Sequence, residues 1–208
     1  MVRTVKKPEV RRQEIIVAAV ELFRTKGYEK TTMQNVMDVI GIAKGTIYHY
    51  FKSKEDLLEA VIEQSVLEYL AGMQAVLDES TGNALDKMRL LFVSGQVADE
   101  EEEILEHLHR PGNAGMQTRQ LAVTISGLAP LYAKVIQQGC DEGVFQTEYP
   151  LESAELILAG IQFLTDMGIH PWEPEDLMRR ALSFPALLEA QLRAPKGSFD
   201  FLIANLND

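Results

Sequence analysis

The stretch TTMQNVMDVIGIAKGTIYHYFKSKEDLLEAVI, residues 31–62, determines the fold class. Apolar residues at helical spacing predict a short helix over 33–40, and the Thr-Thr pair before it supplies an N-terminal cap. Gly41 suits the left-handed conformation that ends a helix, and a tight turn then leads into a second short helix over 44–51. Two short helices joined by a glycine-containing turn are typical of a helix-turn-helix, whose second helix enters the major groove of DNA.

The second of these helices combines side chains that suit contact with DNA. Lys44 and Gly45 lie at its start, where backbone N–H groups favour phosphate and a missing side chain permits close approach. Thr46 offers a hydroxyl and a methyl group to a base edge. Five further polar side chains suit phosphate contacts: Tyr48, His49, Tyr50, Lys52 and Lys54. The alternative is an ordinary helical hairpin with core aromatics, but basic, hydroxyl and aromatic groups together in one short helix favour DNA binding.

The rest of the chain also has helical periodicity. A helix is expected over 8–26, ending before Gly27, and a longer one follows Ser53 and runs to about Leu77. No alternating strand pattern competes, so we expect an all-α protein of about nine helices. The five remaining stretches are about 83–97, 99–109, 116–139, 151–167 and 174–193.

Charge is distributed unevenly along the chain. The net charge is -11, yet residues 1–54 contain 11 basic and five acidic residues, a net of +6, while residues 55–208 have a net of -17. Such asymmetry suggests that the first part meets a polyanion and the second does not. A solvated basic face without a partner is the alternative.

Composition excludes several classes of protein. The chain has 208 residues, 46% of them hydrophobic, and a single cysteine, Cys140, which excludes an internal disulfide framework and a Cys-based zinc site within one chain. No secretory signal and no apolar run long enough for a membrane span is present. We therefore expect a soluble, cytoplasmic protein without membrane association, cofactor or metal.

The residues Gly27-Tyr28, Thr31-Thr32 and GIAKGTIYHYFKSKEDLLEAVI (41–62) resemble the N-terminal domain of the TetR family of bacterial transcriptional regulators, strongly over about residues 9–65. The resemblance implies an all-α homodimer with three-helix DNA-binding heads and a helical domain that binds an effector. It divides the chain into a head at 1–54, with its motif at 32–51, and a regulatory domain at 55–208. It adds Thr32 to the DNA contacts above. The basic tail adds further candidates: Arg3, Lys6, Lys7, Arg11 and Arg12.

A head of this size reads few base pairs, so a symmetric dimer on a palindromic operator is expected. Two apolar stretches, 156–164 and 177–192, correspond in place to the helices that form the family's dimer bundle. Helices that merely close the monomer core are the alternative. The candidate interface residues are Leu156, Ala159, Gly160, Phe163, Leu177, Ala181, Phe184 and Leu188.

The effector site has no sequence motif. Candidates combine an apolar body with a polar tip or a soft sulfur, although such residues are more often simple core. They are Met73, Met88, Phe92, His107, Met116, Tyr132, Phe163, Met167 and Trp172. His107 and His109 lie two residues apart and splay to different helix faces, which argues against a metal site.

The sequence therefore predicts a repressor that binds a palindromic DNA operator as a dimer and is released by a small-molecule effector. One alternative is a DNA-binding regulator controlled by a protein partner instead. A helical enzyme with an incidental basic head is another, but the chain has no phosphate loop, HExxH or GxSxG motif. We expect that it is not an enzyme.

Overall fold

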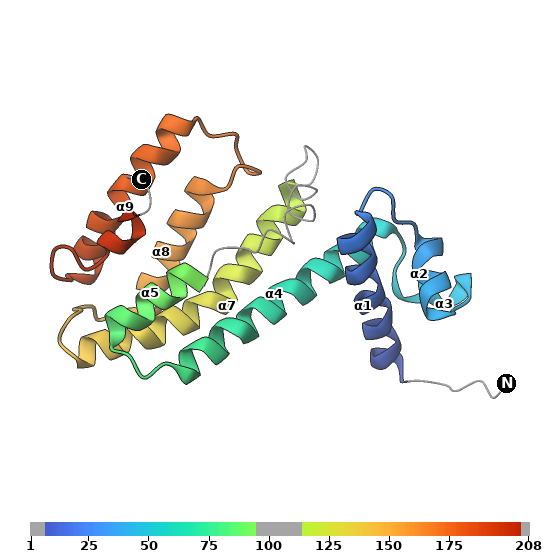
Figure 1. The fold of residues 1–208 in the computed structure, drawn as a ribbon, viewed down its shortest axis with the longest axis horizontal. Coiled ribbons are helices and arrows are strands. Elements are labelled where there is room, and N and C mark those ends of the chain that lie inside the picture. Colours follow the sequence, from blue (N-terminus) through green and yellow to red (C-terminus); the bar gives the residue numbers. More distant parts are fainter. Residues whose placement is uncertain (1–6, 95–113, 205–208) are drawn as a thin grey trace. The chain divides into compact units, whose positions relative to one another are not determined.

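The computed structural model describes residues 7–94 and 114–204, and within these ranges the protein contains helices and no strand (Figure 1). The all-α prediction is confirmed. The expected helix over 99–109, and the end of the one over 83–97, lie outside the described residues. The described α-helices are α1 (Pro8–Lys26), α2 (Met33–Ile40), α3 (Lys44–Tyr50), α4 (Lys54–Glu79), α5 (Ala84–Ser94), α7 (Ala114–Asp141), α8 (Pro150–Thr165) and α9 (Pro174–Leu192).

Among the described residues, the first of two compact units extends to Leu67, inside α4. One longer helix and two short ones bury too little apolar surface to form a stable core by themselves. The first half of α4 supplies what is missing, because Leu57, Leu58 and Val61 are buried. They join the buried residues of α1 to α3, which include Ile15, Ile16, Ala19, Phe23, Val36, Met37 and Ile47.

Local sequence sets the ends of the short helices in this unit. The Thr32 hydroxyl accepts a hydrogen bond from the Asn35 backbone N–H at 3.2 Å, and the Asn35 side chain accepts one from the Thr32 N–H at 3.1 Å. This reciprocal cap satisfies two N–H groups that the helix leaves unpaired. Gly41 ends α2 in the left-handed conformation, with φ 65°. At the start of α4 the Ser53 hydroxyl accepts from the Asp56 N–H at 3.0 Å.

The second unit begins at Glu68 and contains the second half of α4 together with α5, α7, α8 and α9. Its apolar core includes Met73, Leu91, Ile136 and Leu158. A 3-10 turn, η2 (Asp200–Leu202), follows α9 and was not expected from sequence, because three residues are too few to show a period. It is secured by the fully buried Phe199, whose ring stacks on that of Phe145 at 6.0 Å.

The beginning of α5 is tied to the end of α7 by polar contacts. The Glu142 carboxylate accepts a hydrogen bond from the Ala84 N–H at 2.9 Å, and Lys87 Nζ donates to Gln138 Oε1 at 2.9 Å. The Ala84 N–H, and after it the Gln138 amide, hold the pKa of Glu142 below its usual value. This carboxylate caps a helix that is distant in the sequence.

Candidate nucleic-acid interface

Helix α3 is anchored on one side and exposed on the other. Ile47 is fully buried and Phe51 is buried just after the helix end, so this side is fixed in the core of the first unit. Lys44, Gly45 and Tyr48 are exposed on the remaining surface. Residues four apart share a helix face, which explains why the two apolar anchors leave the start of α3 free for contact.

Gly45 has no structural reason to be glycine. It lies in ordinary helical conformation, and a Cβ built on it would meet no atom within 4 Å. Glycine in a helix costs about 0.5–1 kcal/mol relative to alanine. The space beside Gly45 therefore suits the close approach of another molecule to the α3 backbone.

The polar side chains of α3 differ in exposure. Lys44 Nζ lies 5.7 Å from the centroid of the Tyr48 ring, so an ammonium group and a phenol share one exposed surface. His49 is exposed and its ring meets that of Tyr50 edge-on at 5.1 Å. Thr46 and Tyr50 are half-buried. Lys44, Tyr48 and His49 are thus the most accessible groups of this helix for phosphate or base contacts.

The two lysines after α3 are in different surroundings. Lys52 is exposed, and its Nζ lies 3.3 Å from the Tyr48 carbonyl oxygen. Lys54 is half-buried, with Nζ donating to the Tyr28 carbonyl oxygen at 3.0 Å and lying 4.0 Å from the Tyr28 ring centroid. Burial, with the nearby Glu55 and Glu29 charges, raises the pKa of Tyr28 to about 12. Lys54 thus contacts Tyr28 within the head, and its contact with DNA stays a prediction.

A cation missed by the sequence analysis lies near the start of α2. Lys26 Nζ donates to the Asn35 side-chain oxygen at 2.7 Å, beside the cap made by Thr32. Anions are favoured at a helix N-terminus, and Lys26 strengthens that preference. This lysine could have been identified from the sequence, because it directly precedes Gly27, the glycine that ends α1.

The candidates from the basic tail are only partly described. Arg3 and Lys6 lie outside the described residues. Arg11 pairs with Glu14 at 2.8 Å, and Arg12 places its guanidinium 5.3 Å from the centroid of the Phe51 ring. Lys7 is exposed at the start of α1.

The candidate dimer residues separate into exposed and buried groups. Leu156 and Phe163 on α8 are 67% and 51% exposed, although both are large and apolar. Ala159, Gly160, Leu177 and Ala181 are half-buried. Leu188 is only 3% exposed and Phe184 packs against the same core, so both stabilise the monomer and we remove them from the candidate interface.

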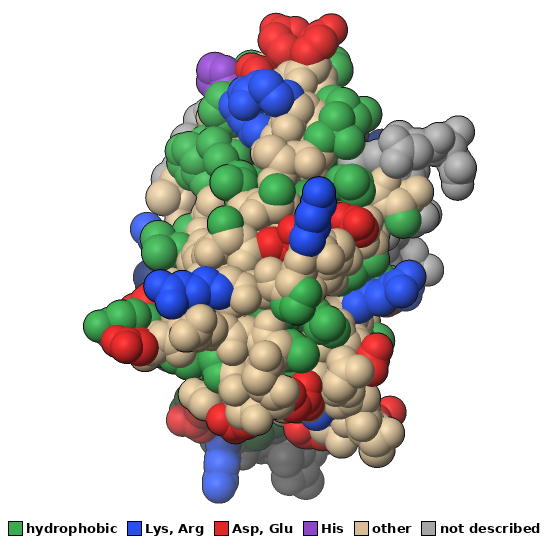
Figure 2. Space-filling view, turned by 90° about the vertical axis from the view of Figure 1, so that its left-hand side faces the viewer, with side chains coloured by type: hydrophobic (Ala, Val, Ile, Leu, Met, Phe, Trp, Pro, Cys, Tyr) green, Lys and Arg blue, Asp and Glu red, His purple; other side chains and the backbone are tan. Residues whose placement is uncertain are grey.

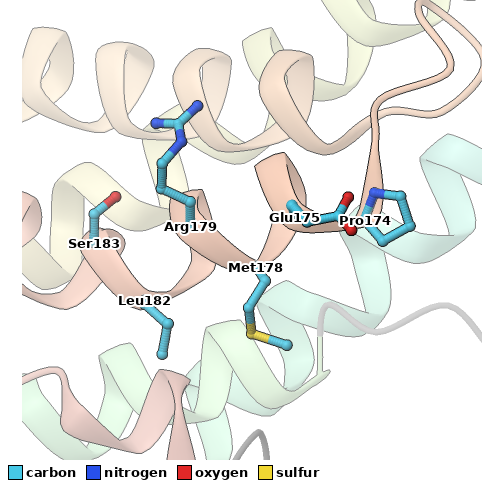
Figure 3. A pocket seen from close by; sticks show the side chains of 6 residues that line it. All are labelled: Pro174, Glu175, Met178, Arg179, Leu182 and Ser183. Atoms are coloured by element: carbon cyan, nitrogen blue, oxygen red, sulfur yellow. The ribbon is translucent and has the colours of Figure 1, made fainter.

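Other exposed apolar residues on α9 replace them. Met178 and Leu182 point to the same side of the helix, one turn apart, beside an open hollow of about 730 Å³ (Figure 3). Leu182 is 48% exposed and Leu187 is 59% exposed. Figure 2 shows hydrophobic side chains among charged ones on one face of the molecule. The sequence did not distinguish these positions from Leu188, because each lies within one apolar stretch.

The candidate effector residues do not form one group. Met73, Met88 and Tyr132 are buried in the core of the second unit, where the Phe92 ring meets Tyr132 edge-on at 5.5 Å. Burial, with a smaller effect from Tyr69, raises the pKa of the Tyr132 phenol. Phe163 and Met167 are exposed instead. His107 lies outside the described residues, as does the side chain of Met116, a residue of α7.

Trp172 lies in the connection between α8 and α9. The Arg180 guanidinium lies 3.9 Å from its ring centroid and donates to the Leu164 carbonyl oxygen at 2.7 Å. Trp172 Nε1 and Gln162 Oε1 are buried without a hydrogen-bond partner among the described residues. Neither residue belongs to the core cluster that contains Met73 and Tyr132.

The described residues contain neither a cluster of metal ligands nor a membrane-spanning helix. No three His, Cys, Asp or Glu side chains in residues 7–94 and 114–204 come together to hold a metal ion. None of the helices that the structure describes is long and apolar enough to cross a membrane.

Comparisons with known proteins match both units. Residues 15–61 match the family model described as "Bacterial regulatory proteins, tetR family", and residues 96–187 match "Tetracyclin repressor-like, C-terminal domain". The transcriptional repressor KstR2 of Mycolicibacterium smegmatis is 36% identical over 107 residues, which cover 51% of this chain and 48% of the relative. KstR2 of Mycobacterium tuberculosis is 24% identical, over 68% of this chain and 72% of the relative. The chain thus spans about half the length of the first relative.

A solved structure shows the same fold. A TetR-family transcriptional regulator from Pectobacterium atrosepticum superposes with a TM-score of 0.62 at 20% identity, covering 91% of this chain and all of that one. The two family models cover more than half of the chain between them, in the order head and then C-terminal domain. The chain belongs to the TetR family of bacterial transcriptional regulators.

Proposed function

We propose that this protein is a transcriptional repressor that binds a palindromic operator as a homodimer and is released from it by a small-molecule effector. The observation on which this rests is the start of α3. There an exposed lysine, an exposed tyrosine and a glycine with open space beside it share one helix end. No contact within the described part of the head requires that glycine, whereas its missing side chain would let DNA approach the backbone closely.

The exposed apolar residues of α8 and α9 support the dimer. Leu156, Phe163, Met178 and Leu182 would be covered by the same helices of a second copy, as in an isologous interface. Two heads held together read two half-sites, which raises affinity and makes the operator palindromic. Repression rather than activation is supported by the names of the KstR2 relatives. The proposal includes a cytoplasmic location.

The effector is supported by the match of the C-terminal domain to the model described as "Tetracyclin repressor-like, C-terminal domain". Because Met73, Met88 and Tyr132 belong to one apolar core and Phe92 packs against it, the effector that we propose there is mainly apolar. Release requires that the effector favour a conformer with lower operator affinity. Control by a protein partner is the second candidate function, but no specific observation favours it.

The first test is a selection of genomic DNA fragments with the purified protein, with affinity for the best fragment measured at two salt concentrations. We expect a palindrome with half-sites about one helical turn apart and an affinity that falls steeply with salt. A metabolite pool should then release the fragment. If no fragment is enriched with or without the pool, operator binding is ruled out.

A further inference from the structure

An arginine at the end of α9 has a backbone conformation that the chain otherwise gives to glycine. Arg193, directly after the helix, has φ 48° and ψ 39°. The other residues with positive φ in the described ranges are all glycines: Gly27, Gly41, Gly143 and Gly197. The left-handed conformation is unfavourable for a residue with a Cβ, so glycine would also be the favourable choice at position 193. An arginine in this place indicates a use for its side chain.

Backbone hydrogen bonds hold Arg193 in this conformation. The Arg193 and Ala194 N–H groups both donate to the Glu189 carbonyl oxygen. The Gln146 N–H donates to the Leu192 carbonyl oxygen at 2.7 Å, which joins the end of α9 to the connection between α7 and α8 (Figure 1). Arg193 is exposed, and its guanidinium makes no hydrogen bond or ion pair within the part of the chain that the structure describes.

Arg193 lines a hollow of about 370 Å³ at this junction. The other lining residues are all polar: Gln146, Thr147, Glu148, Tyr149 and Gln191. Hydrogen bonds to Ser153 fix part of the wall, since Thr147 Oγ1 lies 3.1 Å from Ser153 Oγ and Gln191 Nε2 donates to the Ser153 carbonyl oxygen at 3.2 Å. A hollow of this volume is at the lower end of the range for small-molecule sites, so it suits a small polar ligand.

The lining contains one cation and one anion that are not paired. Glu148, like Arg193, is exposed and forms no ion pair or hydrogen bond through its side chain among the described residues. A guanidinium binds a carboxylate through two parallel hydrogen bonds, and a carboxylate binds an ammonium group. A ligand that satisfies both side chains therefore has a carboxylate and an ammonium group close together, as a free amino acid has.

We propose that this hollow binds a free α-amino acid, with Arg193 on the carboxylate of the ligand and Glu148 on its ammonium group. The Gln146 carboxamide and the Tyr149 hydroxyl offer further hydrogen bonds to the ligand. None of the lining residues belongs to the apolar core where the effector is proposed, so this site is separate from it. The inference does not depend on the proposed function.

The first test uses the full chain and saturation-transfer NMR with the twenty protein amino acids, each at about 2 mM. We expect at least one to bind with a Kd of about 1 mM or below, which titration calorimetry then measures. Two analogues of that amino acid, one without the ammonium group and one without the carboxylate, should each bind at least about tenfold more weakly. Binding by none of the twenty would overturn the inference, as would an analogue that binds equally well.

Substitutions then assign the binding to this hollow. Arg193→Gly should weaken the amino acid by about tenfold or more, while the melting temperature rises by about 2–4 °C because glycine adopts the left-handed conformation without strain. Lys196→Ala is the matched control, since Lys196 is an exposed cation three residues later that does not line the hollow, and its affinity should be unchanged. An Arg193→Gly protein that binds equally well, or that unfolds at a lower temperature, would overturn the inference.

Glu148→Gln is a second variant, in the connection before α8, and it tests the other charge. It should weaken the amino acid by about tenfold and leave the affinity for the analogue without the ammonium group unchanged, which a general loss of structure would not do. Equal weakening of both ligands, or of neither, would overturn the inference.

Discussion

On α3 of the head the exposed positions are occupied by Lys44, Gly45 and Tyr48, whereas on α8 and α9 of the second unit they are occupied by Leu156, Phe163 and Leu182. The first set suits a polyanion and the second an apolar surface. Exposed apolar patches on a folded domain usually mark an interaction site. The difference fits the proposed function, in which DNA is the partner of the head and a second copy of the chain is the partner of the other unit.

The largest expected effect on operator affinity comes from placing a charge among the exposed apolar residues of α9. Leu182→Asp should prevent dimerisation, because it places a charge in the proposed interface, and operator affinity should fall by about a hundredfold as the two heads lose their linkage. Light scattering coupled to size exclusion checks the mass. Val123→Asp, at an exposed apolar position of α7, is the control that should remain dimeric.

Gly45→Ala tests the other surface in this comparison, the exposed start of α3. A methyl group fits within the head, so thermal stability should stay equal or rise by up to about 1 kcal/mol. Operator affinity should fall by about tenfold, since the methyl group occupies space meant for DNA. Fluorescence anisotropy with a labelled operator measures the affinity. A variant that binds as tightly as the original protein would remove the backbone of α3 from the interface.

Lys52 and Lys54, the two lysines after α3, allow a second comparison, between DNA binding and stability within the head. Lys54→Ala should lower the stability of the head by about 1–2 kcal/mol, because it removes a hydrogen bond and a cation–π contact with Tyr28. Lys52→Ala should leave stability unchanged, weaken all DNA sequences alike by about threefold and reduce the salt slope by about one. Chemical denaturation and salt titrations measure the two quantities. Equal effects of both substitutions on stability would contradict these assignments.

The smallest expected effect is on the melting temperature, and it concerns the hydrogen bond between the Glu142 carboxylate and the Ala84 N–H. The pKa of Glu142 is lower in the folded protein than its usual value, so its contribution to stability is present above the unfolded pKa and lost as pH falls through the folded one. Glu142→Gln should therefore lower the melting temperature at neutral pH, and the difference should vanish below about pH 4, the usual range for Glu. Glu155→Gln, on an exposed turn of α8, should show no such trend.

Much of the head was predictable from sequence, because its signals are local. The capping by Thr32, the left-handed Gly41 and the bounds of α1 and α2 depend on residues within one or two turns of each other. The exposed start of α3 follows from the spacing of Ile47 and Phe51. The contact of Lys54 with Tyr28 was not predictable, since Tyr28 lies 26 residues earlier and no local pattern records that contact.

The second unit was predictable in its helices but not in its contacts. The stretch 177–192 reads as one apolar run, and only the packed core shows that Leu188 is buried while Leu182 and Leu187 are exposed. The η2 turn is likewise held by Phe199 on Phe145 rather than by its own residues.

The sequence by itself determined the all-α class, the helix-turn-helix and the resemblance to the TetR family, and it predicts DNA contacts at the start of α3, because periodicity, caps and a nearly contiguous motif are properties of neighbouring residues. The tertiary structure alone decided that the packing of the first unit extends into α4, that Lys54 binds Tyr28 and which apolar residues of α9 stay exposed. Burial and close packing depend on which distant segments meet, and that is settled only when the whole chain has folded.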